Sequence, residues 1–237
     1  MKKIIALVCT AVLFAHAQAT ELITNGGFET GSLAGWTTSG LTAPGSCGGG
    51  VAAQDWTVSN VGTATNCSDP GNPPQGTYAA YNMFDAGAPL TYRLRQTIQI
   101  PENTIRGTLR WSDSLIYGFS GLPRVFSIRI LNAAGTATLA TLYSNSVVGS
   151  ATTGWVSRTQ NVGGSLAALS GQTVIIEFAV AIQEVWTGPA GMGLDAVSLD
   201  IDVQKPVPTV STYGLIGLML VVAIFGIGVG RRRLTLR

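Results

Sequence analysis

Residues 91–100 have the sequence TYRLRQTIQI, in which apolar and polar side chains alternate. Successive side chains of a β-strand point to opposite faces, so one face of this segment is expected to be buried and the other exposed. Such a one-sided pattern is typical of an antiparallel sheet that packs against a core. The predicted buried set is Tyr92, Leu94, Gln96, Ile98 and Ile100, and the predicted exposed set is Arg93, Arg95, Thr97 and Gln99.

Short segments rich in β-branched and aromatic residues recur between Gly, Pro and Asn residues, and each predicts a strand. The evenly apolar segment 174–181 predicts a central strand, whereas residues 37–76, rich in Gly, Pro and Ser, contain no predicted strand. The spacing predicts an all-β fold, an antiparallel jelly-roll β-sandwich over residues 20–203. The predicted strands are 91–100, 106–112, 125–131, 137–143, 155–162, 173–181 and 194–203.

Residues 1–19 have the pattern of a secretory signal peptide. Two lysines precede an apolar run over residues 4–15, and Ala17-Gln18-Ala19 supplies the small residues that a signal peptidase recognises. The run is too short to cross a bilayer comfortably, which argues against a permanent N-terminal anchor. We therefore expect export, cleavage by signal peptidase and a mature chain that starts at Thr20.

The other end of the chain predicts a membrane span. Residues 213–230 are uncharged and mostly Leu, Ile, Val, Met, Phe and Gly. At about 1.5 Å per residue they cover roughly 27 Å, close to the thickness of a hydrocarbon core. Residues 231–237 begin with Arg231, Arg232 and Arg233, so the C-terminus is expected to stay cytoplasmic while the preceding domain lies outside. The prolines of segment 204–212 predict an extended linker before the span.

This C-terminal arrangement resembles the IPTL-CTERM protein-sorting signal of Gram-negative bacteria. That signal has Ile-Pro-Thr-Leu-Ser-Glu-Trp-Gly, an apolar helix and an arginine cluster, and this chain has Thr212-Tyr213 where the family has Glu-Trp. The resemblance implies a precursor held in the inner membrane, a membrane sorting protease that cleaves near the Pro-Thr segment, and a mature domain in the periplasm, on the cell surface or outside the cell. The matching residues and conservative departures are Val207, Pro208, Thr209, Val210, Ser211, Gly214, Arg231, Arg232 and Arg233.

Charge and histidine content exclude several function classes. Residues 20–204 hold seven Arg against twelve Asp and Glu, a net charge of −5, and no basic stripe. Nucleic acid is therefore not an expected partner. The single histidine, His16, leaves with the signal peptide, so catalytic triads that need imidazole and histidine-based zinc sites lose an essential part.

Cys47 and Cys67 are the two cysteines of the mature chain. An even pair in an exported protein predicts a disulfide, with two buried free thiols as the alternative. The bond would close a loop of about twenty residues and stabilise the fold by about 3 kcal/mol in the chain-entropy model.

Three short motifs resemble jelly-roll, galactose-binding-like domains related to carbohydrate-binding modules. They are Asn25-Gly26-Gly27-Phe28-Glu29 followed by Gly35-Trp36, the segment LRQTI over 94–98, and LDAVSL over 194–199. In such domains the first and last strands lie side by side, which would bring Glu29 near Asp195. The resemblance implies a structural calcium ion held by Asn25, Glu29 and Asp195, since Ca²⁺ takes oxygen ligands. The alternative is that Asp195 caps backbone amides and Glu29 is solvated.

Carbohydrate binding would need exposed aromatic faces on which sugar rings stack. Trp36 and Trp155 each follow a Gly at a predicted strand start and are expected in the core. For each remaining candidate the alternative is also a place in the core. The candidates in or beside loop-like sequence are Trp56, Tyr78, Tyr81, Tyr117 and Trp186.

Catalysis of glycoside cleavage would need two carboxylates placed around the bond. Glu177 is the candidate, with Glu184 or Asp113 as its partner; the alternative is a carboxylate paired with Arg129 or Arg110. No glycosidase motif surrounds Glu177. The favoured hypothesis is an exported, non-catalytic domain with polysaccharide as its candidate ligand. The alternatives are a polysaccharide-active glycoside hydrolase or lyase, and a purely structural surface protein without a small ligand.

Overall fold

The computed structural model describes residues 18–39, 54–60, 72–84, 89–117, 122–149, 151–183 and 190–204, together with 214, 216, 217, 219 and 220. One compact unit, Ala17–Gln204, carries the fold, and a second unit consists of Met1–His16 and Lys205–Arg237. Most of the predicted signal peptide, the motif at 207–211 and the arginine cluster at 231–233 lie outside the described residues. Among the described residues, no helix is both long enough and apolar enough to cross a membrane.

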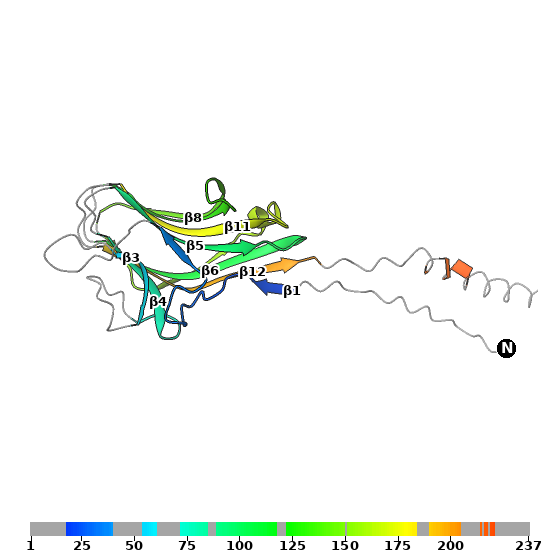
Figure 1. The fold of residues 1–237 in the computed structure, drawn as a ribbon, viewed down its shortest axis with the longest axis horizontal. Helices are drawn as coiled ribbons and strands as arrows, with labels where there is room; N and C mark the ends of the chain where they lie inside the picture. Colours follow the sequence, from blue (N-terminus) through cyan, green and yellow to red (C-terminus); the bar gives the residue numbers. More distant parts are fainter. Residues whose placement is uncertain are drawn as a thin grey trace, which may run out of the picture. The chain divides into compact units, whose positions relative to one another are not determined.

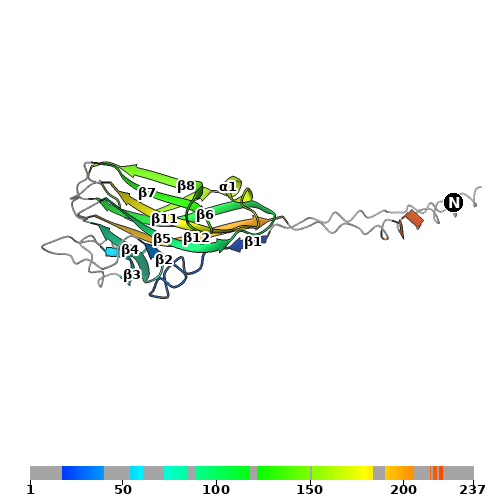
Figure 2. The same cartoon turned by 45° about the horizontal axis from the view of Figure 1, so that its top comes forward.

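Ala17–Gln204 forms a sandwich of two antiparallel sheets (Figures 1 and 2). Within the described residues the smaller sheet has five strands, in the order β2-β5-β11-β7-β8, and the larger has seven, with the path β10-β6-β12-β4-β3, β1 beside β12 and β9 beside β6. The strands of the smaller sheet are β2 (Thr37–Ser39), β5 (Leu90–Gln99), β7 (Arg124–Asn132), β8 (Thr138–Val147) and β11 (Thr173–Ile182). Those of the larger sheet are β1 (Gln18–Glu21), β3 (Gln54–Asn60), β4 (Tyr78–Phe84), β6 (Thr104–Tyr117), β9 (Ala151–Thr152), β10 (Val156–Asn161) and β12 (Ala190–Val203); a short helix, α1 (Gly163–Ala167), follows β10.

The core lies between the two sheets, as the alternation in β5 predicts. Tyr92, Leu94 and Ile98 are buried, while Thr97 and Gln99 on the opposite face are exposed. The buried set of the neighbouring strand β11 lies beside them on the same face, and the apolar face of the larger sheet packs against both. The shared apolar cluster includes Val174, Ile176, Phe178, Val180, Leu109, Trp111, Leu115, Leu199 and Ile201. The predicted all-β sandwich is therefore confirmed.

Gln96 is the polar member of this buried set. Its carboxamide oxygen accepts a hydrogen bond from the backbone N–H of Thr24 and its amide nitrogen donates to the carbonyl of Thr24, both at 2.9 Å. Because both ends of the amide are satisfied, the core accommodates it without an orphaned polar group. This pair of bonds ties the N-terminal segment to the smaller sheet.

The N-terminal segment runs beside the last strand, as the motif resemblance implies. Ala19 is the register partner of Asp202 in the β1–β12 pair, and the Val197 N–H donates to the Gly26 carbonyl at 3.0 Å. A Cβ on Gly26 would lie 1.9 Å from the Val197 carbonyl oxygen, so only glycine permits this approach. The two ends of the domain are thereby joined edge to edge.

Several strand predictions need correction. β6 continues past 112 to Tyr117, β12 begins at Ala190, and 37–76, predicted to be strand-free, contains β2 and β3. β4 was not predicted either. Its sequence YAAYNMF carries two alanines, which favour strands poorly. Ala79 and Ala80 point to opposite faces of the strand, and both are buried. Cys47 and Cys67 lie outside the described residues, so the disulfide stays a prediction.

Candidate functional site

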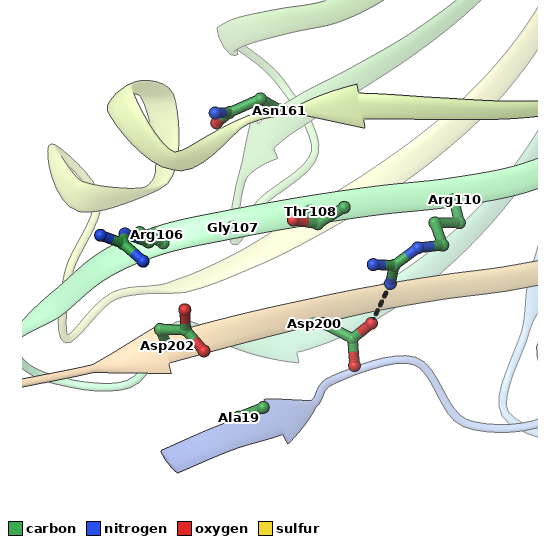
Figure 3. Close-up of a pocket in the computed structure, with 8 residues that line it drawn as sticks. All are labelled: Ala19, Arg106, Gly107, Thr108, Arg110, Asn161, Asp200 and Asp202. Atoms are coloured by element: carbon green, nitrogen blue, oxygen red, sulfur yellow. Dashed lines mark hydrogen bonds and ion pairs between the residues drawn. The ribbon is translucent and has the colours of Figure 1, made fainter. Parts of the chain in front are cut away.

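A polar hollow of about 420 Å³ lies against the larger sheet (Figure 3). Four neighbouring strands, β1, β6, β10 and β12, supply its walls. Figure 3 shows the arginine and aspartate side chains on β6 and β12 close to one another. The lining residues are Ala19, Arg106, Gly107, Thr108, Arg110, Asn161, Asp200 and Asp202.

Strand alternation places this hollow on the outer face of the sheet. Leu199 and Ile201 of β12 are fully buried in the core, so Asp200 and Asp202 point away from it. On β6 the same holds for Arg110, because its neighbour Leu109 is fully buried. The hollow therefore opens to solvent, where a ligand can enter it, and is not part of the protein interior.

The charges of the hollow are balanced. Arg110 donates a hydrogen bond to Asp200 (Figure 3), and their side chains are 48% and 38% exposed. Arg106 is the register partner of Asp202, and Figure 3 draws no bond between these two. Guanidinium groups donate, carboxylates accept and the carboxamide of Asn161 does both. This set suits a ligand that carries many hydroxyl groups and no net charge.

Two of the aromatic candidates for sugar stacking lie in the core. Trp56 and Tyr81 are 4% and 2% exposed, which is the stated alternative for them, so neither offers a free face to a sugar ring. They lie in β3 and β4, two strands that the sequence pattern does not predict. Tyr78 is half-buried. The side chains of Tyr117 and Trp186 lie outside the described residues.

The two tryptophans that are expected in the core, Trp36 and Trp155, differ in burial. Trp36 is buried, and its ring centroid lies 5.7 Å from that of Phe28 and 5.8 Å from that of Phe178. Trp155 is half-buried, with its centroid 6.2 Å from that of Tyr81 in an edge-on arrangement. The core prediction is confirmed for Trp36 only.

Glu29 and Asp195 meet at one corner, where both carboxylates bind the same backbone segment. Glu29 accepts N–H bonds from Thr77 at 2.9 and 3.1 Å and from Tyr78 at 3.0 Å. Asp195 accepts from Gln75 at 3.1 Å and from its neighbour Ala196 at 2.6 Å. Burial raises the pKa of Asp195 to about 6, and the negative charge of Glu29 adds to the shift, although the amide bonds oppose it.

These contacts bear on the predicted calcium ion. The oxygens of Glu29 and Asp195 meet N–H donors, and the Asn25 amide nitrogen donates to the carbonyls of Ser32 and Ala34 at 2.9 and 3.1 Å. As they stand, these three side chains do not fit an oxygen cage around a cation. In the part of the chain that the structure describes, no group of three or more His, Cys, Asp or Glu could hold a metal ion. Calcium stays a prediction of the sequence.

Glu177 is held by arginines from both neighbouring strands. Its side chain is 1% exposed and lies 2.6 Å from Arg95, 2.5 Å from Arg129 and 3.6 Å from Arg93. The expected pairing with Arg129 is thus observed, whereas Arg110, the other predicted partner, binds Asp200 instead.

Asp113, a suggested partner of Glu177, lies on a different face. It shares its face of β6 with the core residues Trp111 and Leu115 and accepts bonds from Trp111 Nε1 at 2.7 Å and from Arg158. The bond with Asp113 raises the pKa of the Arg158 guanidinium. Glu177 points outward from the other sheet, so the structure does not bring these two carboxylates together. Glu184 lies outside the described residues.

Solved structures are similar to this chain at low sequence identity. A cyclase from Fischerella sp. TAU is similar with a TM-score of 0.50 and 18% identity, covering 80% of this chain and 100% of its own. The carbohydrate-binding module TmCBM61, solved with beta-1,4-galactotriose, has a TM-score of 0.46 and 16% identity, covering 78% and 99%. No family model and no curated protein matches the chain. At such identities a likeness concerns the fold alone.

Proposed function

We propose that this chain is an exported, non-catalytic β-sandwich protein that binds extracellular polysaccharide in the polar hollow of its larger sheet. The observation that carries the proposal is the hollow itself, about 420 Å³ in volume and lined by two Arg, two Asp, one Asn and one Thr. Its side chains project from adjacent strands, which hold hydrogen-bonding groups more rigidly than loops do.

The chemistry of the hollow favours sugar hydroxyls. A hydroxyl donates one hydrogen bond and accepts others, and bonds to charged partners are the strongest of these. The Arg110–Asp200 pair offers both roles side by side, with each side chain still partly exposed. The lining thus offers two guanidiniums as donors and two carboxylates as acceptors to the hydroxyl groups of a sugar.

Processing would change one wall of this hollow. Ala19 lines it and lies opposite Asp202 in the strand register. Cleavage after Ala19 removes that wall and leaves the new ammonium group of Thr20 next to the position that Ala19 occupied. The processed protein therefore has a wider hollow, in which the ammonium group adds hydrogen-bond donors and one positive charge near Asp202.

The binding proposal is tested with the processed protein, purified from cells that express the full chain, on a glycan array followed by calorimetry. Arg110→Gln and Asp200→Asn should each weaken binding of the best neutral glycan about tenfold, since each removes a charge-assisted bond worth about 1.4 kcal/mol. Thr97→Ala, on the outer face of the other sheet, is the matched control and should bind as the parent does. Failure to bind any glycan would favour the purely structural alternative.

The proposed route to the outside rests on the two ends of the chain. A signal peptide at 1–19, a span at 213–230 and the cluster Arg231–Arg233 together support a precursor anchored in the inner membrane with a cytoplasmic C-terminus. A sorting protease would then release the domain. Intact mass of the protein recovered from cells tests this directly: a mass that spans Thr20 to Arg237 would contradict cleavage of the tail.

A further inference from the structure

The outer face of the smaller sheet carries a cluster of three arginines around one carboxylate. In the register of the sheet, Glu177 of β11 lies between Arg95 of β5 and Arg129 of β7. Arg93, two residues before Arg95, also points to this face and approaches Glu177 at 3.6 Å. Ile176 and Phe178, on either side of Glu177, are fully buried in the core, so the cluster faces away from it.

This cluster holds more positive charge than the fold requires. Glu177 has a side chain that is 1% exposed, whereas those of Arg93, Arg95 and Arg129 are 35%, 26% and 30% exposed. Three guanidiniums against one carboxylate leave a net charge of +2 on this patch. One guanidinium would neutralise Glu177, and like charges at such range repel each other. Among the described residues, no second carboxylate balances the remaining positive charge.

Many donors of the cluster have no acceptor among the residues that the structure describes. Each guanidinium carries five N–H groups. Glu177 accepts hydrogen bonds from Nε of Arg95 and from Nη2 of Arg129, Nη2 of Arg95 forms an ion pair with it at 2.6 Å, and Arg93 Nη1 donates to the Thr91 carbonyl. Among the described residues, Nε of Arg129 is buried and has no partner. Because this nitrogen is shielded from solvent, the donors that an incoming oxygen atom can reach are those on the partly exposed parts of the three guanidiniums.

We infer that this cluster is a recognition site for the oxyanions of an acidic polysaccharide, carboxylate or sulfate. Glu177 fixes the guanidiniums from below, and their remaining N–H groups present the planar donor pairs that bind such oxyanions in a bidentate manner. The flanking positions of the same face include four small hydroxyl residues, Thr37, Ser39, Ser127 and Thr141, together with Ala179, Ile175 and Leu131. With these neighbours, about a quarter to a third of each guanidinium-bearing side chain stays exposed.

The negative charge of the rest of the domain limits where a polyanion can bind. The mature body carries a net charge of −5, so a polyanion is attracted at this patch and repelled elsewhere. A nucleic acid would need a wider basic surface to hold its phosphates. The inference does not depend on the hollow of the larger sheet, which lies on the opposite side of the sandwich.

Matched polymer pairs test this site. The processed protein is titrated with polygalacturonate and with its fully methyl-esterified form, and separately with dextran sulfate and with dextran. The expected result is binding to at least one charged polymer, little binding to its neutral partner, and an affinity that falls as salt rises. The pair that shows the difference identifies carboxylate or sulfate as the ligand group.

Variants then locate the binding. Arg93→Gln, which removes the arginine least committed to Glu177, should weaken binding about fivefold, and Arg93→Lys should restore part of it. Gln99→Ala, on the same face and strand, is the matched control, and circular dichroism checks the fold of each variant. Equal binding to charged and neutral polymers, or full affinity in both Arg93→Gln and Arg129→Gln, would overturn the inference. Equally tight binding of a DNA duplex would contradict the polysaccharide assignment.

Discussion

The two outer faces of the sandwich use the same residue types in opposite ways. On the larger sheet arginine and aspartate face each other in equal number, and the Arg110–Asp200 pair is well exposed. On the smaller sheet three arginines share one carboxylate, Glu177, whose side chain is 1% exposed. The first face is electrically balanced and adaptable, whereas the second is charged, and its arginines are fixed in position by a buried anion. Stability and ligand choice should therefore respond differently to mutations on each face.

The largest expected loss of stability is that caused by Glu177→Gln. This change leaves three guanidiniums without their anion, and breaking a buried ion pair from one side typically costs about 3 to 5 kcal/mol. Urea unfolding followed by tryptophan fluorescence measures the loss. A cost below about 1 kcal/mol would mean that the arginines do not depend on Glu177 for their placement.

The second-largest expected effect is a dependence of the unfolding free energy on pH that is due to Asp195. Whereas Glu177 is held by guanidiniums, this buried carboxylate accepts hydrogen bonds from backbone amides. Its pKa of about 6 in the folded protein lies above the usual 3.8, so the folded state holds the proton more tightly. Stability from this group is fully present below about pH 4 and is lost as pH rises to 6 and beyond, by roughly 2 to 3 kcal/mol. Unfolding free energies at pH 4 to 7, compared with those of Asp195→Asn, isolate this contribution; parallel pH profiles for the two proteins would contradict it.

A smaller stability effect is expected from Asp200→Asn on the balanced face. Exposed ion pairs contribute about 0 to 1 kcal/mol, so this substitution should lower the free energy of unfolding by less than about 1 kcal/mol while it weakens sugar binding. The comparison with Glu177→Gln is made under the same urea conditions. Comparable losses in both variants would remove the energetic distinction between the two faces.

The smallest expected effect is from removal of divalent cations. Glu29 and Asp195 already accept backbone N–H bonds, so a cation would have to displace these bonds to bind. We expect EDTA to change Tm by less than about 1 °C, within the range of minor surface effects. A drop of several degrees, reversed by Ca²⁺, would instead establish the calcium ion that the sequence predicts.

Sequence patterns with a local cause predicted the fold well. The alternation in TYRLRQTIQI identified the buried face of β5, whereas the place of the first segment beside the last strand was implied by the resemblance to jelly-roll domains. β4 is not predicted because its alanines carry no strand signal by themselves. The burial of Trp56 and Tyr81 is not apparent from the sequence because they lie in β3 and β4, two strands that the pattern does not predict.

The candidate sites depend on register, which a single sequence does not specify. The pairing of Glu177 with Arg129 was among the expected alternatives, but the contribution of Arg93 and Arg95 follows from β5 lying next to β11. The hollow combines β1, β6, β10 and β12, whose residues are up to 183 positions apart between Ala19 and Asp202. Neither arrangement leaves a motif in the chain.

The most direct test of the account is a crossed binding measurement on the two faces. Calorimetric titration of one neutral and one acidic polysaccharide is carried out with the parent protein, Asp200→Asn and Arg93→Gln. The account predicts that Asp200→Asn weakens the neutral ligand alone and that Arg93→Gln weakens the acidic ligand alone. Parallel losses for both ligands in either variant, or no change in any titration, would contradict it.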